Sequence, residues 1–161
     1  MGMEKPKPAT EHKWLHRLVG EWTSEGTMLM GPDQPPMTST GTYSVKPLGE
    51  VWIVGEMTGE MPGSNETSTS ILSLGYEPEK KKCVGTFISE MMAGMWVYEG
   101  SLKGDVLTLD TEGPSFTGEG RAKYQDIIEI KSDDEHTLSS QVLGDEGKWT
   151  RFMTMTFKRK K

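Results

Sequence analysis

A basic side chain and two methionines share one face of the last apolar segment. In the expected strand 148–159, Arg151, Met153 and Met155 alternate with other residues, so an extended backbone places them on the same side. A guanidinium binds carboxylates and phosphates, and methionine adapts to irregular apolar shapes. The pattern predicts a site for an amphipathic molecule whose anionic group meets Arg151. The alternative is a structural ion pair between Arg151 and an internal acid such as Glu56.

Two other segments carry side chains that suit the same kind of ligand. In 94–102, Glu99 marks the outer face and turns Trp96 and Tyr98 inward, and in 21–30 Met28 alternates with polar residues. A wall of Met, Trp and Tyr fits an apolar or flat amphipathic molecule. The predicted ligand-binding residues are Arg151, Met153, Met155, Met28, Trp96 and Tyr98. These side chains could instead meet as ordinary core.

Catalytic and metal-binding patterns are weak by comparison. His12 and His16 lie four residues apart without a third ligand, which favours two exposed histidines on a helix. Cys83 has no histidine in its own segment, and phosphate-loop, Gly-x-Ser-x-Gly and Cys-x-x-Cys motifs are missing. We therefore assign no catalytic residue and predict no metal and no cofactor. A reaction inside the fold that uses Arg151, Tyr98 and Glu56 remains an alternative, so enzymatic activity is left open.

The composition indicates the fold that must position these residues. The 161-residue chain has 17 Thr, 8 Val and 6 Ile against 3 Ala, with 19 Gly and 9 Pro. β-Branched residues favour strands, and Gly and Pro favour turns, so an all-β domain is expected. The net charge of −6 argues against a nucleic-acid partner, and the basic end 158–161 is interpreted as a solvated tail that binds neither nucleic acid nor membrane.

Periodicity predicts one short helix followed by an antiparallel meander. The helix begins with Thr10 as N-cap, carries Trp14, Leu15 and Leu18 on one stripe, and ends at Gly20. The expected strands are 21–30, 38–46, 50–60, 67–76, 82–90, 94–102, 105–111, 118–130, 136–143 and 148–159. Because the connectors are of hairpin length and open edges invite aggregation, we expect a single up-and-down barrel over 10–160 after a flexible segment 1–9.

The two ends of such a barrel differ in composition. The helix shares its end with short, mostly charged connectors and is expected to plug it. The connectors at the other end contain or adjoin Met30, Met37, Met61, Met91, Met92 and Phe116. We predict that this end is the mouth, although the methionines could also fill the core. About ten strands make a barrel wide enough for a ligand.

Several short segments resemble a known family. They are Gly20-Glu21-Trp22 after the helix, residues 35–41, 59–61 and 74–77, and the closing run 154–159. Across residues 11–160 the chain resembles the bacterial domain-of-unknown-function family 1579, whose barrel is calycin-like, as in lipocalins and fatty-acid-binding proteins. This resemblance implies the fold but no activity and no catalytic residues. Similar barrels of the nitrobindin type hold haem through a histidine, whereas none of the histidines here is expected in the middle of a strand.

Closure of the barrel has a predicted contact. If the last strand pairs with the first, inward Trp22 lies near inward Arg159, and in similar calycin barrels a basic side chain covers this tryptophan.

The first ten residues contain no apolar run, so no signal peptide is predicted and a cytoplasmic location is expected. We expect a module that binds a small hydrophobic or amphipathic molecule in the barrel. A protein-interaction module that uses the Met-rich rim is the other alternative.

Overall fold

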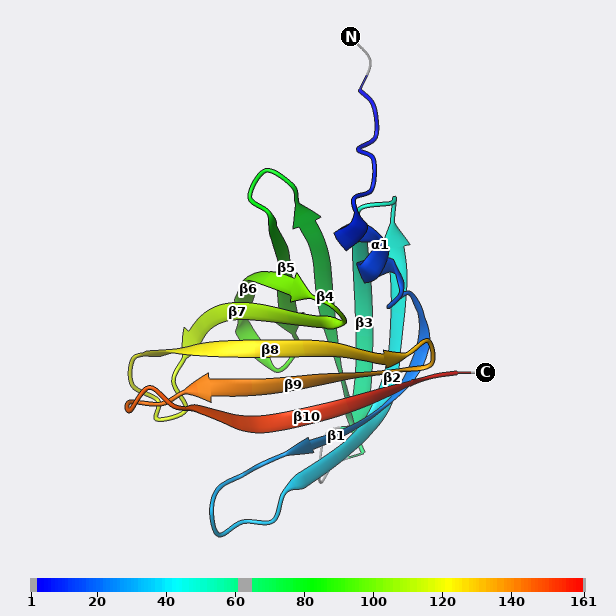
Figure 1. The fold of residues 1–161 in the computed structure, drawn as a ribbon. Helices are drawn as coiled ribbons and strands as arrows, with labels where there is room; N and C mark the ends of the chain where they lie inside the picture. Colours follow the sequence, from blue (N-terminus) through cyan, green and yellow to red (C-terminus); the bar gives the residue numbers. More distant parts are fainter. Residues whose placement is uncertain (1–2, 61–64, 161) are drawn as a thin grey trace.

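The computed structural model describes residues 3–60 and 65–160, in which one helix precedes ten strands (Figure 1). Their bounds are α1 (Thr10–His16), β1 (Gly20–Met28), β2 (Met37–Leu48), β3 (Trp52–Glu60), β4 (Thr67–Glu77), β5 (Lys82–Ser89), β6 (Met92–Lys103), β7 (Val106–Pro114), β8 (Arg121–Ser132), β9 (Glu135–Leu143) and β10 (Trp149–Arg159). The ten predicted strands are confirmed, each shifted by no more than a few residues at its ends.

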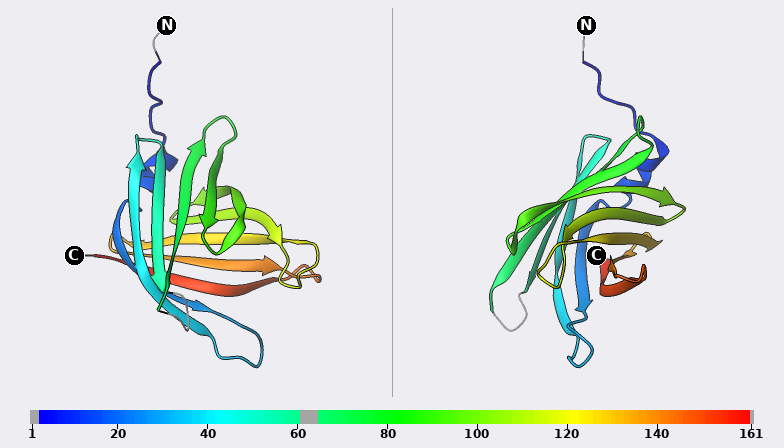
Figure 2. Two further views of the ribbon diagram at one scale, coloured as in Figure 1. Left: turned by 180° about the vertical axis from the view of Figure 1, so that it is seen from behind. Right: turned by 90° about the vertical axis from the view of Figure 1, so that its left-hand side faces the viewer.

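The strands form a closed antiparallel barrel in which each strand pairs with its neighbours in sequence and β10 pairs with β1. Figure 2 shows how strongly the long strands coil around the interior. Coiling of this kind is the normal right-handed twist of β-strands, and the pairing of β10 with β1 leaves neither terminal strand as a free edge. The predicted up-and-down barrel is therefore confirmed.

Helix α1 lies against the end of the barrel that holds the β2–β3, β4–β5, β6–β7 and β8–β9 turns. Trp14, Leu15 and Leu18 are buried there, as the helical stripe predicts. The Trp14 indole N–H donates to Asp105 in the β6–β7 turn at 3.2 Å, and Arg17 forms an ion pair with the same carboxylate at 2.8 Å. The N-cap is Ala9 instead of the predicted Thr10, and α1 ends at His16, before a turn that leads into Gly20.

Closure of the barrel brings Trp22 of β1 opposite Arg159 of β10. The guanidinium carbon of Arg159 lies 4.2 Å from the centre of the Trp22 ring, which confirms the predicted cation–π contact and its register. The same guanidinium donates to the carbonyls of Val19 and Asp133, each at 2.9 Å. A side chain at Gly20, which has φ +143°, would overlap this guanidinium, so glycine is required where the helix turns into β1.

A β-bulge in β10 changes which residues face inward. The pairing with β9 shifts between Arg151, which lies opposite Gln141, and Met153, which lies opposite Ser140. One extra residue reverses the alternation, so Met153 faces inward but Arg151 faces outward and is exposed. The predicted inward orientation of Arg151 is wrong because it assumed an unbroken period of two.

Candidate functional site

Burial changes along the interior from one end of the barrel to the other. On β1, inward Trp22 is 1% exposed whereas inward Met28 is 41% exposed. On β10, Phe157 is buried whereas Met155 and Met153 are partly exposed, and on β6 Tyr98 is buried whereas Trp96 is partly exposed. We call the part near α1 the closed half and the part with partly exposed inward residues the mouth half.

The closed half is filled by rings in direct contact. His136 of β9 stacks on Phe157 with centroids 4.7 Å apart and meets Trp22 edge-on at 4.3 Å. Tyr43 of β2 packs against Phe157 at 4.9 Å. Burial, with the nearby Arg159 charge as a smaller cause, lowers the pKa of His136 to about 4. This half is a solid core whose histidine is neutral at physiological pH.

The mouth half is lined by aromatic side chains, of which Tyr124 is buried while Trp96, Phe152 and Phe116 are partly or largely exposed. Trp96 meets Tyr124 of β8 edge-on at 5.2 Å, and Phe152 in the β10 bulge contacts Phe116 of the β7–β8 loop at 4.9 Å. A side chain at Gly113 of β7 would overlap the Trp96 ring, so this glycine leaves the space that the indole occupies. The arrangement presents aromatic surface at one end of the interior.

A polar network crosses the interior between these halves. Tyr98 donates a hydrogen bond to Asp126 Oδ2 at 2.5 Å, and Ser140 donates one to Asp126 Oδ1 at 2.5 Å. Burial raises the pKa of Asp126, an effect that these two hydrogen bonds partly oppose. Burial, together with the Asp126 charge, raises the pKa of Tyr98, so this phenol keeps its proton and remains a donor.

The structure brings five of the six predicted ligand-binding residues to the interior. Met153, Met155, Met28 and Trp96 lie on inward positions of the mouth half, and Tyr98 lies just below them. Their role in ligand binding stays a prediction.

Two residues that were expected inside the barrel lie on its outer face. Arg151 faces outward, and Glu56 is exposed on the outer face of β3, opposite Ser44 and Ile71. The two cannot form the expected ion pair within the barrel. The alternative of a reaction that combines Arg151, Tyr98 and Glu56 inside the barrel is also not supported, because these three side chains do not come together.

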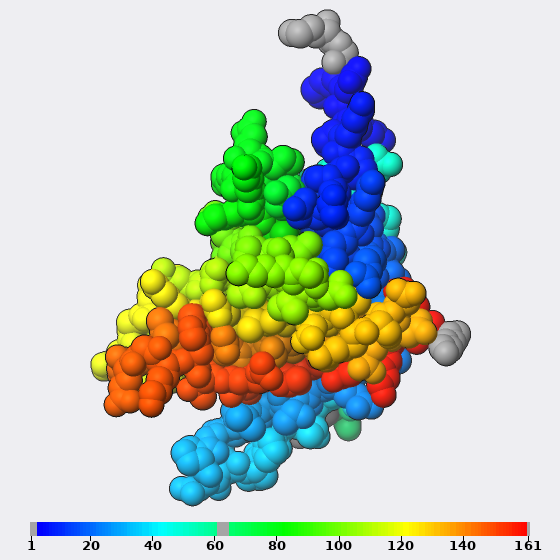
Figure 3. Space-filling model, in the orientation of Figure 1, coloured from blue at the N-terminus to red at the C-terminus, as the bar shows by residue number. Residues whose placement is uncertain are grey.

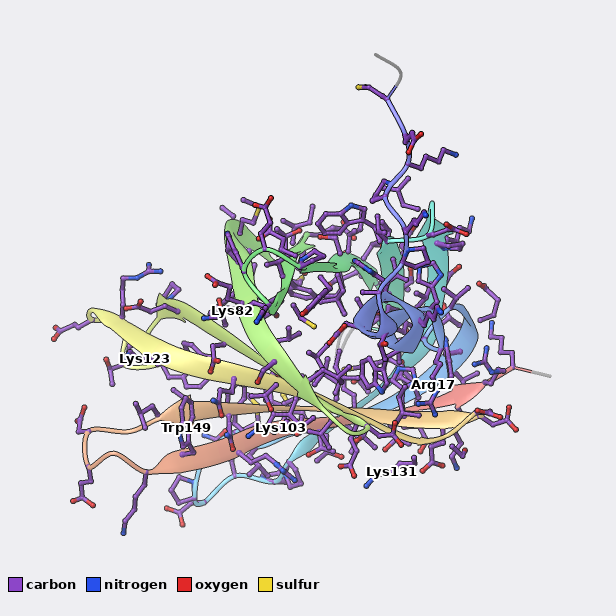
Figure 4. The ribbon with its side chains drawn as sticks, turned by 45° about the horizontal axis from the view of Figure 1, so that its top comes forward. Arg17, Lys82, Lys103, Lys123, Lys131 and Trp149 are labelled. Carbon is purple, nitrogen blue, oxygen red and sulfur yellow. The ribbon has the colours of Figure 1, made fainter. Side chains whose placement is uncertain are left out.

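Basic side chains of the strands lie on the outer face of the barrel. Lys82, Lys103, Lys123 and Lys131 are all exposed, and Figure 4 shows them among the side chains that surround the strands. Among the described strand residues, Arg159 at the closed end is the exception. Asp126 is likewise the one acid on an inward strand position within the described ranges.

His12 differs from its predicted exposed position. His12 is not exposed: its Nδ1 accepts from the Ala9 N–H at 2.8 Å and its Nε2 donates to the Tyr76 carbonyl at 2.9 Å. These bonds attach α1 to β4, so His12 is structural.

In the part of the chain that the structure describes, no group of three or more His, Cys, Asp or Glu side chains could hold a metal ion. Burial raises the pKa of the Cys83 thiol to about 11.

The geometry of the barrel agrees with a comparison of sequences. Residues 7–159 match the family described as "Protein of unknown function (DUF1579)". The chain belongs to this family. A search among curated proteins found none that matches. Membership of DUF1579 confirms the resemblance seen in the sequence and leaves the activity to be argued from the site.

Two solved structures share the architecture of this DUF1579 barrel. Rv2717c from M. tuberculosis is 14% identical, with a TM-score of 0.61, and the match covers 96% of this chain and 100% of that one. A redesigned beta barrel is 14% identical, with a TM-score of 0.50, and the match covers 90% of this chain and 93% of that one. At this identity the likeness extends to the fold alone.

In residues 3–60 and 65–160, no helix has the length and apolar character needed to span a membrane.

The loops around the mouth half carry exposed apolar side chains. Met30, Met91 and Met92 are exposed, and Phe116 is 69% exposed. The β1–β2 loop, coloured blue in Figure 3, projects away from the body of the barrel. The predicted rim is present in these loops, while Met61 lies outside the described residues.

Sequence reasoning missed the polar network and part of the aromatic wall. Asp126 was not singled out because 118–130 mixes apolar and polar residues on both faces. With Ile128 and Ile130 assigned inward, the period of two would have placed Asp126 and Tyr124 on the same face. Phe152 could not have been found in this way, because the bulge that turns it toward Tyr124 is not apparent from the alternation.

Proposed function

We propose that this protein binds a small hydrophobic or amphipathic molecule in the mouth half of its barrel. The observation that supports this proposal is the change of burial along single strands. Met153, Met155 and Trp96 face inward and yet stay partly exposed, whereas inward residues nearer α1 on the same strands are buried. Inward apolar side chains that remain open to solvent can gain burial from a ligand.

The composition of the wall indicates the kind of molecule. Methionine side chains adjust to different shapes, and the partly exposed rings of Trp96 and Phe152 offer flat surfaces for stacking or edge contacts. Asp126 and Ser140 supply polar atoms that can fix the orientation of a bound molecule. The bound molecule would therefore have an apolar body and at least one polar group.

Titration with the uncharged fluorophore N-phenyl-1-naphthylamine tests this proposal. We expect a saturable rise in its fluorescence. Met155→Trp adds bulk to an inward position and should weaken binding by about tenfold or more, because the indole takes up space that the probe would occupy. Thr156→Trp is the matched control, because it places the same side chain on the outer face of β10.

The pair of variants distinguishes the interior from the exposed rim. Equal affinity of Met155→Trp and Thr156→Trp would show that the probe binds elsewhere and would contradict the proposal. Binding that never saturates would do the same.

A further inference from the structure

Asp126 lies in the interior without a cationic partner. None of the ion pairs formed by the described residues includes it, and all of them involve side chains on the outside or at the closed end. Arg159 is occupied at the closed end by Trp22 and by backbone carbonyls. Buried charges in proteins are normally paired, because an unpaired charge loses its hydration without compensation. Among the described residues, no cationic side chain therefore opposes the burial that raises the pKa of Asp126.

The carboxyl group is held in place by neutral donors only. Tyr98 and Ser140 each occupy one of its oxygens, and a carboxylate oxygen can accept a further hydrogen bond. Both donors are themselves buried, so the orientation of Asp126 is fixed before any ligand arrives. Such a group is ready to accept a charge-assisted hydrogen bond or to face a cation.

Aromatic side chains lie next to this carboxyl group on the side of the mouth. Tyr124 is two residues from Asp126 on the same face of β8, and Trp96 is two residues from Tyr98 on the same face of β6. The Tyr124 hydroxyl donates to the Pro114 carbonyl at 2.5 Å, which holds its ring in place beside Trp96. The faces of Trp and Tyr rings attract cations, most strongly where water is excluded.

We propose that the interior recognises the cationic group of an amphipathic molecule, an ammonium or a quaternary ammonium, between Asp126 and the aromatic rings of Trp96, Tyr98 and Tyr124. This inference rests on the proposed function and specifies its ligand. It reverses the charge expected when Arg151 was assigned to the interior. The net charge of −6 favours the approach of cations.

Three probes with the same apolar body test the inference on the unmodified protein by calorimetric titration. They are 4-phenylbutyl-trimethylammonium, its uncharged analogue with carbon in place of nitrogen, and 4-phenylbutane-sulfonate. We expect the cation to bind about tenfold or more tightly than the uncharged analogue, because a contact with a buried charge has this size. The sulfonate should bind most weakly.

The variant Asp126→Asn removes the charge and keeps a side chain of the same shape. It should lower the affinity for the cation by about tenfold or more and leave the uncharged analogue within about twofold. Asp110→Asn is the matched control: this acid lies on the outer face of β7, where it accepts a hydrogen bond from Gln125 at 2.8 Å. It should change neither affinity.

Each outcome has a separate meaning. Equal binding of the three probes by the unmodified protein would overturn the cation proposal while the interior site stands. No saturable binding of any probe would overturn the proposed function itself. A cation preference that persists in folded Asp126→Asn would show that another group recognises the charge, which also contradicts the proposal.

Discussion

The closed half and the mouth half of the barrel are built from the same strands but differ in what covers them. At the closed end, α1 and Arg159 exclude water from Trp22, His136 and Phe157. At the other end, loops of 90–91, 115–120 and 144–148 leave inward methionines and aromatic rings partly exposed. Buried apolar side chains are therefore concentrated in one half, while inward side chains of the other half stay accessible to solvent.

This division explains where polar groups are tolerated. In the closed half, Trp22 donates to the Leu18 carbonyl at 3.0 Å, whereas buried His136 leaves its Nδ1 without a partner. Asp126 lies where the aromatic mouth begins and is held by two hydroxyl donors. A carboxyl group at this depth is partly desolvated and still reachable from the mouth, which suits recognition better than stability.

Two truncations on one face of β10 compare the halves directly. Phe157→Ala should lower the free energy of unfolding by about 3–5 kcal/mol, because it opens a hole in a core that cannot collapse around it. Met153→Ala, on the same face near the mouth, should cost about 1 kcal/mol or less because the side chain is already partly exposed. Urea unfolding measures both. Similar losses for the two variants would remove the distinction between the halves.

Acid should destabilise the closed half through His136. Its pKa is 6.5 when free and about 4 when folded, so the unfolded chain takes up this proton first. Protonation of His136 therefore does not change the free energy of unfolding above pH 6.5. It lowers this free energy by about 3 kcal/mol as the pH decreases from 6.5 toward 4. The charged and titratable groups that face it are Arg159 and Tyr43, and burial raises the pKa of Tyr43, so this phenol keeps its proton.

The variant His136→Gln isolates this effect. Urea unfolding at pH 7 and pH 4.5 should show a smaller loss of stability on acidification for His136→Gln than for the unmodified protein. An identical loss in both proteins would mean that His136 does not resist protonation in the fold.

The smallest expected effect concerns the cover of the closed end. Arg159→Met should cost about 0.5–2 kcal/mol from the lost contact with Trp22. Lys158→Met, one residue earlier and on the outer face, should stay within about 0.5 kcal/mol. Thermal unfolding of the two variants provides the measurement, and an Arg159→Met protein as stable as Lys158→Met would show that the guanidinium does not cover the end.

Much of the fold could be predicted because its signals are local. The ten strands follow from alternation and from turn residues between them, and the plug follows from the stripe Trp14, Leu15 and Leu18. The contact between Trp22 and Arg159 also followed, since closure of a meander brings the first strand beside the last. Five of the six expected site residues then faced inward because no bulge lies between them and the buried inward residues of their own strands.

The sequence alone thus determined the barrel, its plugged end and the apolar lining of its mouth, since period and turn chemistry act between near neighbours. Only the tertiary structure decided the charge of the interior. The bulge beside Phe152 turned Arg151 outward, and the pairing of β8 with β9 placed Asp126 beside Ser140. The first outcome depends on one extra residue that reverses the faces of β10 without a change in local pattern, and the second depends on which residues of β8 and β9 pair.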